Sequence, residues 1–415
     1  MLLSIKQGNT NPIVLLATGI VVSLYLPIIF SNVIIICTTL LGLLDFWRDN
    51  KQSSFVDFYD FKLSAPILLF VFCAISLFFS QNLFTGLKAL ETRSPLILLP
   101  LGLFSLGKLK EEQLNRIVIY FILASVAISL YSLGMAMTNF LNTSSNTEDM
   151  QSPFAYHSLA APLNFHAGYL SMMTSCGALF TLCKIKFDFG WNTVLRIVAF
   201  GILSGFTLLL STFSVSIGFF AGVIFCLFKK RDELKPVVLG LFFLVFVSIA
   251  VPASKYLEIK LRGISFEMDT KGNVEGNRFT PISGRLAKWG SSIELIVDHP
   301  FGVGVGDAQK VLNGYYLKNG LEYGYVESFD PHNLFLSYAI SCGVAAGFLI
   351  LLLIIVAWRD FVRFKMLEGQ LFLIVFSAFS LTESTLSRNK GLVFFLFFLL
   401  IFRGYTEIRR KNNII

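Results

Sequence analysis

Residues 330–358 read DPHNLFLSYAISCGVAAGFLILLLIIVAW. A polar start that contains His332 leads directly into the apolar run 333–358, and a helix needs about 20 such residues to cross a bilayer. Similar runs recur along a chain that is 55% hydrophobic and only 14% charged. A soluble domain averages about 25% charged residues, and a soluble fold of this composition would expose large apolar patches. The composition therefore predicts an all-α polytopic membrane protein.

Twelve apolar runs are candidates for membrane spans. They cover residues 12–30, 32–47, 63–81, 94–107, 116–137, 165–183, 195–210, 215–228, 236–252, 333–358, 369–382 and 391–403. The 44 Phe residues suit helices that face lipid. The centres of these spans carry almost no charged residues, whereas ion-coupled transporters usually have them near the midplane.

Basic residues are concentrated in alternate loops between these runs. Because cytoplasmic loops carry an excess of Lys and Arg, this alternation predicts about twelve crossings with both termini in the cytoplasm. It also splits 195–228 into a hairpin that turns near Ser211–Ser216. Apart from one long loop, the outer side carries only Lys88, Arg93, Arg388 and Lys390.

This topology divides the chain into three parts. Residues 1–252 hold nine spans, residues 253–331 form a long outer loop with short helices, and residues 332–415 hold three spans and a cytoplasmic tail. Long loops translocate largely regardless of charge, so the nine basic residues of this loop do not contradict its outer location. The net charge of +8 fits the basic cytoplasmic loops better than nucleic-acid binding.

All four histidines lie on the outer side in this topology, where they could make hydrogen bonds at the membrane interface or transfer protons, for which His suits neutral pH. They are His157, His166, His299 and His332. Pro331 fits the first turn of a helix and would hold His332 rigidly at the membrane surface. A structural capping role is the alternative for His332. The six cysteines lie in apolar runs without a CxxC pair and predict neither disulfides nor a metal site.

The long loop contains a predicted helix from Ser283 to Val297. One stripe of it carries Leu286, Trp289, Ile293 and Ile296. Ser283 would cap the start, and Arg285 would lie in the first turn, beside free N–H groups that favour a phosphate. The alternative is an amphipathic helix that lies on the membrane, with Arg285 touching lipid headgroups.

The glycine run, residues 300–306 (PFGVGVG), follows this helix. Its G-x-G-x-G spacing differs from the G-x-G-x-x-G fingerprint of dinucleotide-binding folds. We instead expect a tight backbone passage beside the site, where a side chain would not fit.

These motifs resemble the O-antigen ligase and polymerase superfamily of bacterial inner membranes. Its members are twelve-helix glycosyltransferases with a long periplasmic loop between the ninth and tenth spans, and the topology agrees over the whole chain. The local resemblance rests on Arg285, Trp289, the glycine run, and His332-Asn333 followed by nine residues and Gly343. The ligase pattern continues with two residues and then Gly, Thr or Tyr, where this chain has Ala346 followed by Gly347.

The resemblance implies a site on the periplasmic face and a donor glycan carried on undecaprenyl pyrophosphate. It implies that Arg285 binds the pyrophosphate and that His332 activates the acceptor hydroxyl of lipid A–core or of another lipid-linked glycan. No metal, cofactor or nucleic-acid partner is expected. Further substrate contacts are expected at Trp289, Gly304, Gly306, Asn333, Arg278, Lys288 and His166.

Two departures from the family pattern leave alternatives open. A second family Arg follows a Ser between the seventh and eighth spans, and Val215 stands at its place. Either another cation substitutes for it, or the protein has diverged or lost activity; the candidates are Arg278, Lys288 and Arg262. Ala346 slightly favours a polymerase, whereas the His-Asn-x9-Gly spacing favours a ligase. A transporter or flippase for lipid-linked sugars is the alternative from another class, and it would need a cationic cavity within the membrane.

Overall fold

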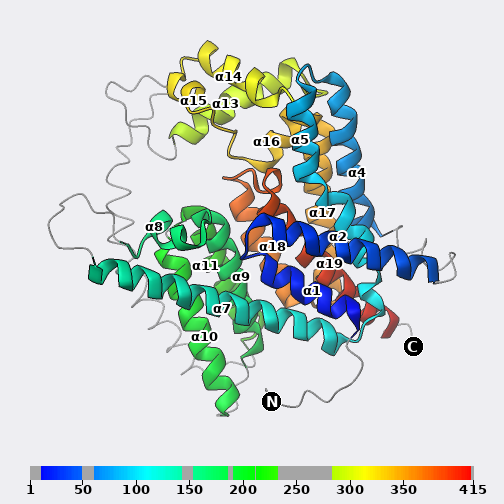
Figure 1. Cartoon of the computed structure of the whole chain (residues 1–415), viewed down its shortest axis with the longest axis vertical. Coiled ribbons are helices and arrows are strands. Elements are labelled where there is room, and N and C mark those ends of the chain that lie inside the picture. Colours follow the sequence, from blue (N-terminus) through cyan, green and yellow to red (C-terminus); the bar gives the residue numbers. More distant parts are fainter. Residues whose placement is uncertain are drawn as a thin grey trace.

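The computed structural model describes residues 11–48, 60–142, 153–185, 190–210, 212–231 and 283–412. Every regular element in these ranges is a helix, which confirms the all-α class (Figure 1). The α-helices are α1 (Pro12–Ser23), α2 (Ile28–Arg48), α4 (Phe61–Ser76), α5 (Leu83–Arg93), α6 (Pro95–Leu103), α7 (Glu111–Asn142), α8 (Tyr156–Ala160), α9 (Ala167–Lys184), α10 (Trp191–Leu209), α11 (Phe213–Lys229), α13 (Ser283–Asp298), α14 (Ala308–Lys318), α15 (Glu322–Val326), α16 (Leu334–Cys342), α17 (Val344–Arg363), α18 (Leu367–Ser380) and α19 (Asn389–Asn412). The predicted span 236–252 lies outside the described residues.

Seven segments of the described chain are long and apolar enough to cross a membrane. They are Ile28–Trp47, Phe61–Phe79, Leu83–Lys108, Glu111–Asn142, Trp191–Leu209, Val344–Arg363 and Asn389–Asn412. Helices α1, α11 and α18 are shorter but also apolar. The chain is therefore a polytopic membrane protein, while the count of twelve crossings stays a prediction. The predicted division of run 195–228 is confirmed, since α10 ends at Leu209 and α11 begins at Phe213, whereas the hairpin topology of the two helices stays a prediction.

Two predicted spans are interrupted in the structure. The run 12–30 contains the end of α1 at Ser23 and the start of α2 at Ile28. The run 333–358 breaks at Gly343, between α16 and α17, where φ is +90°. Hydropathy registers neither break, because apolar residues continue through both turns.

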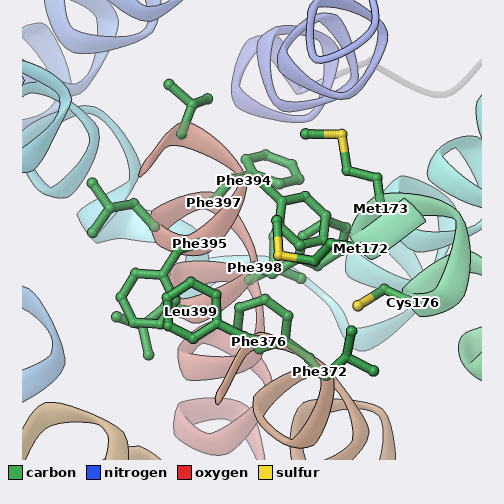
Figure 2. Close-up of a cluster of buried hydrophobic side chains, with 14 of the residues drawn as sticks. Met172, Met173, Cys176, Phe372, Phe376, Phe394, Phe395, Phe397, Phe398 and Leu399 are labelled. Carbon is green, nitrogen blue, oxygen red and sulfur yellow. The ribbon is translucent and has the colours of Figure 1, made fainter. Parts of the chain in front are cut away.

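Helix α19 lies in the core of the protein, since every residue from Gly391 to Thr406 is buried. A helix that is apolar all round is expected to be buried on every side. Phe395 stacks on Phe376 of α18 with ring centroids 4.2 Å apart, within the Phe cluster shown in Figure 2. The prediction that Phe residues face lipid is therefore wrong for α19, whose rings fill the protein interior.

Two basic residues at the predicted cytoplasmic side, Lys62 and Arg403, are buried within the protein. Arg403 is fully buried and donates to carboxylate oxygens of Asp60 and Glu407, each at 3.0 Å. Lys62 is buried between Asp60 and Asp360. A buried charge is tolerated when it is paired and hydrogen-bonded, so these contacts tie the start of α4 to α17 and α19.

The loop helices α13, α14 and α15 lie together at one end of the molecule, beside α16 (Figure 1). They share a small apolar core with α16. Its buried members are Leu295, Leu312, Tyr316, Leu321 and Ile340. Because Ile340 belongs to α16, this core joins the loop helices to the membrane-spanning part.

Replacing Gly343 by alanine should destabilise the protein. Its φ of +90° is unfavourable for other residues, and an added Cβ would lie 2.9 Å from the carbonyl carbon of Phe301. Gly205 in α10 is the matched control, because a Cβ there meets nothing within 4 Å and Ala favours a helix by about 1 kcal/mol. Thermal unfolding in detergent measures both variants. An unchanged melting temperature for Gly343→Ala would contradict the close backbone contact.

Candidate active site

His332 lies immediately before α16 and is not part of it. The helix begins after Asn333, whose side chain accepts hydrogen bonds from the N–H groups of Phe335 and Leu336 at 3.0 and 3.1 Å. The prediction that Pro331 occupies the first helical turn is therefore wrong. Asn is among the best N-caps, and here Asn333 takes the capping role considered for His332.

The backbone of His332 is held in the left-handed region, with φ at +48°. Its N–H donates to Asp330 Oδ1 at 3.0 Å, which stabilises the tight turn. Such conformations are uncommon outside glycine, and they persist where the surrounding structure over-determines them, often at active sites. The left-handed backbone of His332 and its hydrogen bond to Asp330 therefore fix where the imidazole lies.

Glu383, in the turn between α18 and α19, contacts the same imidazole. Its Oε1 lies 3.1 Å from His332 Nδ1, and Asp330 Oδ1 lies 3.5 Å away. Burial would raise the pKa of Glu383, but the hydrogen bond with His332 and the nearby cations outweigh burial and hold that pKa below its ordinary value. An ionised Glu383 accepts a hydrogen bond from the Nδ1–H of His332. The lone pair on Nε2 can then take a proton, as a general base does.

The predicted loop helix is confirmed as α13, and it brings two cations to the same place. Lys288 Nζ lies 4.6 Å from the centroid of the Phe329 ring, and that centroid is 5.8 Å from the His332 ring. Arg285, about one turn earlier, acts electrostatically on both Lys288 and Glu383. The cations of α13 and the His332–Glu383 pair therefore lie within electrostatic range of one another.

The site is compact enough to perturb Lys288. Burial first, and then repulsion from Arg285, lowers the pKa of Lys288 to about 8, although Asp330 and Glu383 act in the opposite direction. An anion that binds beside the Lys288 amine would stabilise its charged form. The two cations are thus suited to a phosphate group.

The predicted apolar stripe of α13 is divided in the structure. Trp289 and Ile296 are partly buried, whereas Leu286 and Ile293 are 51% and 53% exposed. The indole Nε1 of Trp289 is buried and has no hydrogen-bond partner within the described part of the chain. The side chain of Ser283 lies outside the described part, so its predicted capping role is not tested.

His166 caps α9, because its Nδ1 accepts from a backbone N–H in the first turn at 3.2 Å. Its ring centroid lies 5.0 Å from that of His157, and the charges of Glu383 and His332 act on it. Three of the four histidines therefore gather at the site. His299 is an exposed residue at the end of α13.

The glycine run passes where side chains would not fit. A Cβ on Gly304, whose φ is +90°, would lie 2.4 Å from Ser80 Oγ, and one on Gly306 would lie 2.2 Å from the Asn82 carbonyl oxygen. The predicted tight passage is confirmed, and it packs the run against the turn before α5. Contact of Gly304 and Gly306 with substrate stays a prediction.

The His-Asn-x9-Gly spacing corresponds to one structural unit. Its nine residues are the whole of α16, and its Gly343 is the break that follows. The N–H of Val344 donates to the Pro300 carbonyl at 3.0 Å, which docks the glycine run onto this break. Ala346 is fully buried, so its departure from the ligase pattern concerns helix packing.

Val215 is also fully buried. Its neighbour Ser214 instead points to the outer turn, where its Oγ accepts from the Thr382 hydroxyl at 2.6 Å. Of the cations considered as replacements for the second family Arg, Lys288 lies at the site. The others, Arg262 and Arg278, lie outside the described residues.

Glu383 was not predicted from the sequence. The signal was its position, as a carboxylate in the turn that follows the run 369–382, on the side that carries the histidines. Within the described ranges, no three His, Cys, Asp or Glu side chains are arranged to hold a metal ion. Independence of metals stays a prediction.

The Lys288 amine should react with an acylating reagent at lower pH than ordinary lysines, because its pKa is about 8. Arg285→Gln should shift the Lys288 profile to higher pH by removing repulsion. Lys318, whose pKa is raised by Glu294, is the internal control. Competitive labelling read by mass spectrometry follows both sites in one sample. Identical profiles for Lys288 and Lys318 would contradict this electrostatic description.

A comparison with curated proteins found no match. Residues 198–351 match the family model described as O-antigen ligase, Wzy_C. The matched stretch includes Arg285, Lys288, the glycine run, His332 and Gly343, but it ends before Glu383. The chain is a multi-pass membrane protein whose residues 198–351 resemble the O-antigen ligase domain.

Proposed function

We propose that this protein transfers a glycan from undecaprenyl pyrophosphate to an acceptor hydroxyl of lipid A–core. The observation that supports this is the placement of Arg285 and Lys288 beside the His332–Glu383 pair. Cations bind a pyrophosphate, and a base activates an attacking hydroxyl. Both kinds of group are close together here.

In the proposed reaction, the acceptor hydroxyl attacks the anomeric carbon of the donor sugar. His332 Nε2 takes the hydroxyl proton as the new glycosidic bond forms. The bond from the anomeric carbon to the phosphate oxygen breaks, and undecaprenyl pyrophosphate leaves with the bonding electrons. Glu383 keeps the imidazole oriented and stabilises the imidazolium, as a carboxylate does for a catalytic His elsewhere.

Arg285 and Lys288 would stabilise the charge that develops on the leaving pyrophosphate. Lys288 supplies the second cation that the family pattern would place at position 215. Position 215 cannot supply that charge, because Val215 is apolar and buried. Lys288 can supply it, because its amine lies over the Phe329 ring near His332. With a pKa of about 8 the Lys288 amine is still mostly charged at neutral pH, and a bound phosphate would raise that pKa.

The proposed location is the periplasmic face of the bacterial inner membrane, with both termini in the cytoplasm. The distribution of basic residues between alternate loops supports this orientation. Purified protein incubated with lipid-linked donor and either lipid A–core or a second lipid-linked glycan separates the ligase from the polymerase. Movement of intact donor across the bilayer without a new glycosidic bond would instead indicate a transporter.

His332→Asn and His332→Gln should each lower transfer by about 10²–10⁴-fold, because neither amide can take a proton. Asn tolerates the left-handed backbone of position 332, so this variant should also accumulate normally. The measurement is glycan transfer by equal amounts of purified protein. His299→Gln is the matched control, because His299 is exposed at the end of α13. Retention of most activity in either His332 variant would refute the proposed base.

A further inference from the structure

Two buried hydroxyl groups beside the site have no hydrogen-bond partner within the described part of the chain. They belong to Tyr169 in α9 and to Ser384 in the turn before α19, which are 4% and 1% exposed. A buried polar group without a partner is costly, and it is the exception in native structures. These two groups therefore need an explanation.

Both residues are neighbours of Glu383. Ser384 follows Glu383 directly in the chain. The Tyr169 ring lies 5.6 Å from the His166 ring, and its hydroxyl is within electrostatic reach of Glu383 and Asp330.

The Tyr169 ring has little freedom to find a partner elsewhere. It packs edge-on against Phe379 at 5.3 Å, and its Cε1 lies only 2.5 Å from where a Cβ on Gly391 would be. A larger residue at position 391 would collide with the ring. The hydroxyl is thus held in place by packing, in the way that a binding group is held before its ligand arrives.

We propose that Tyr169 and Ser384 form a hydroxyl-binding subsite for the acceptor sugar, a role that rests on the proposed transferase function. Sugar hydroxyls can both donate and accept, as Tyr and Ser hydroxyls can, so each protein hydroxyl would gain its missing partner. The acceptor is assigned because both residues neighbour Glu383, which contacts the imidazole that would take the acceptor proton, whereas the cations of α13 would bind the donor pyrophosphate.

The subsite predicts an unusual pairing of effects for Tyr169→Phe and Ser384→Ala. No hydrogen bond to the described part of the chain is lost, so the melting temperature without substrate should stay the same or rise. The KM for acceptor should rise by about two- to tenfold, the value of one lost neutral hydrogen bond, while the KM for donor stays unchanged.

The chain offers two matched controls. Tyr25 is a buried tyrosine whose hydroxyl does have a partner, Ser125 Oγ at 2.7 Å, so Tyr25→Phe should lower the melting temperature and leave acceptor KM unchanged. Ser204 in α10 has a buried hydroxyl without a partner in the described chain, and it is not among the groups placed at the site. Ser204→Ala should therefore alter neither acceptor nor donor KM.

Three outcomes would overturn the subsite. The first is an unchanged acceptor KM in both variants, and the second is a rise confined to donor KM. The third is a fall in melting temperature for Tyr169→Phe as large as that for Tyr25→Phe, because the hydroxyl would then have a partner inside the protein.

A binding measurement separates failure of the subsite from failure of the transferase proposal. The probe is the core oligosaccharide released from lipid A–core by mild acid, and the readout is thermal stabilisation of purified protein. The wild type should be stabilised, and Tyr169→Phe should lose most of that stabilisation. Stabilisation without any transfer would refute the transferase and keep the subsite, whereas equal stabilisation of both proteins, or of neither, would refute the subsite.

Discussion

Close backbone contact between the glycine run and the two ends of the α16–α17 break sets the geometry of the site. The N–H groups of Val303 and Gly304 donate to carbonyls in the last turn of α16, and the Pro300 carbonyl accepts from the first residue of α17. Gly302 and Gly343 make this approach possible, since a Cβ on Gly302 would lie 2.5 Å from the Gly343 nitrogen. α13 directly precedes the run, so these contacts also determine where its cations lie.

The same unit places His332, the proposed base. α16 is short and ends at Gly343, while its other end is capped by Asn333, and His332 is the next residue outward. The nine residues of the motif are the length of α16, so they set the separation between His332 and Gly343, where the glycine run docks. A longer or shorter α16 would separate His332 from the cations of α13.

Electrostatic interactions link the cations of α13 to the carboxylates beside His332. Arg285 and Lys288 repel each other, and the carboxylates of Asp330 and Glu383 offset that repulsion in part. Glu383 contacts the imidazole of His332, and its charge also offsets part of the positive charge of Arg285 and Lys288. A bound pyrophosphate would complete the neutralisation and favour the charged form of Lys288.

Local sequence signals predicted the parts of the site that depend on neighbouring residues. The helix α13 and the tight glycine run were both visible in short stretches of sequence. Glu383 was missed because it reaches His332 from 51 residues away, and no periodicity records such a contact. The interruption of run 333–358 and the burial of Phe395 were missed for a related reason. Hydropathy measures apolar character, and it does not separate a helix break or a protein interior from a lipid-facing span.

The central claim is that Glu383 acts through the imidazole of His332. A double-mutant cycle with Glu383→Gln and His332→Asn tests it most directly, using transfer rates of the two single variants and the double variant. If Glu383 works only by orienting the base, the double variant should be no slower than His332→Asn alone. Rate losses that multiply would contradict the claim, because they would show that the carboxylate and the imidazole contribute independently.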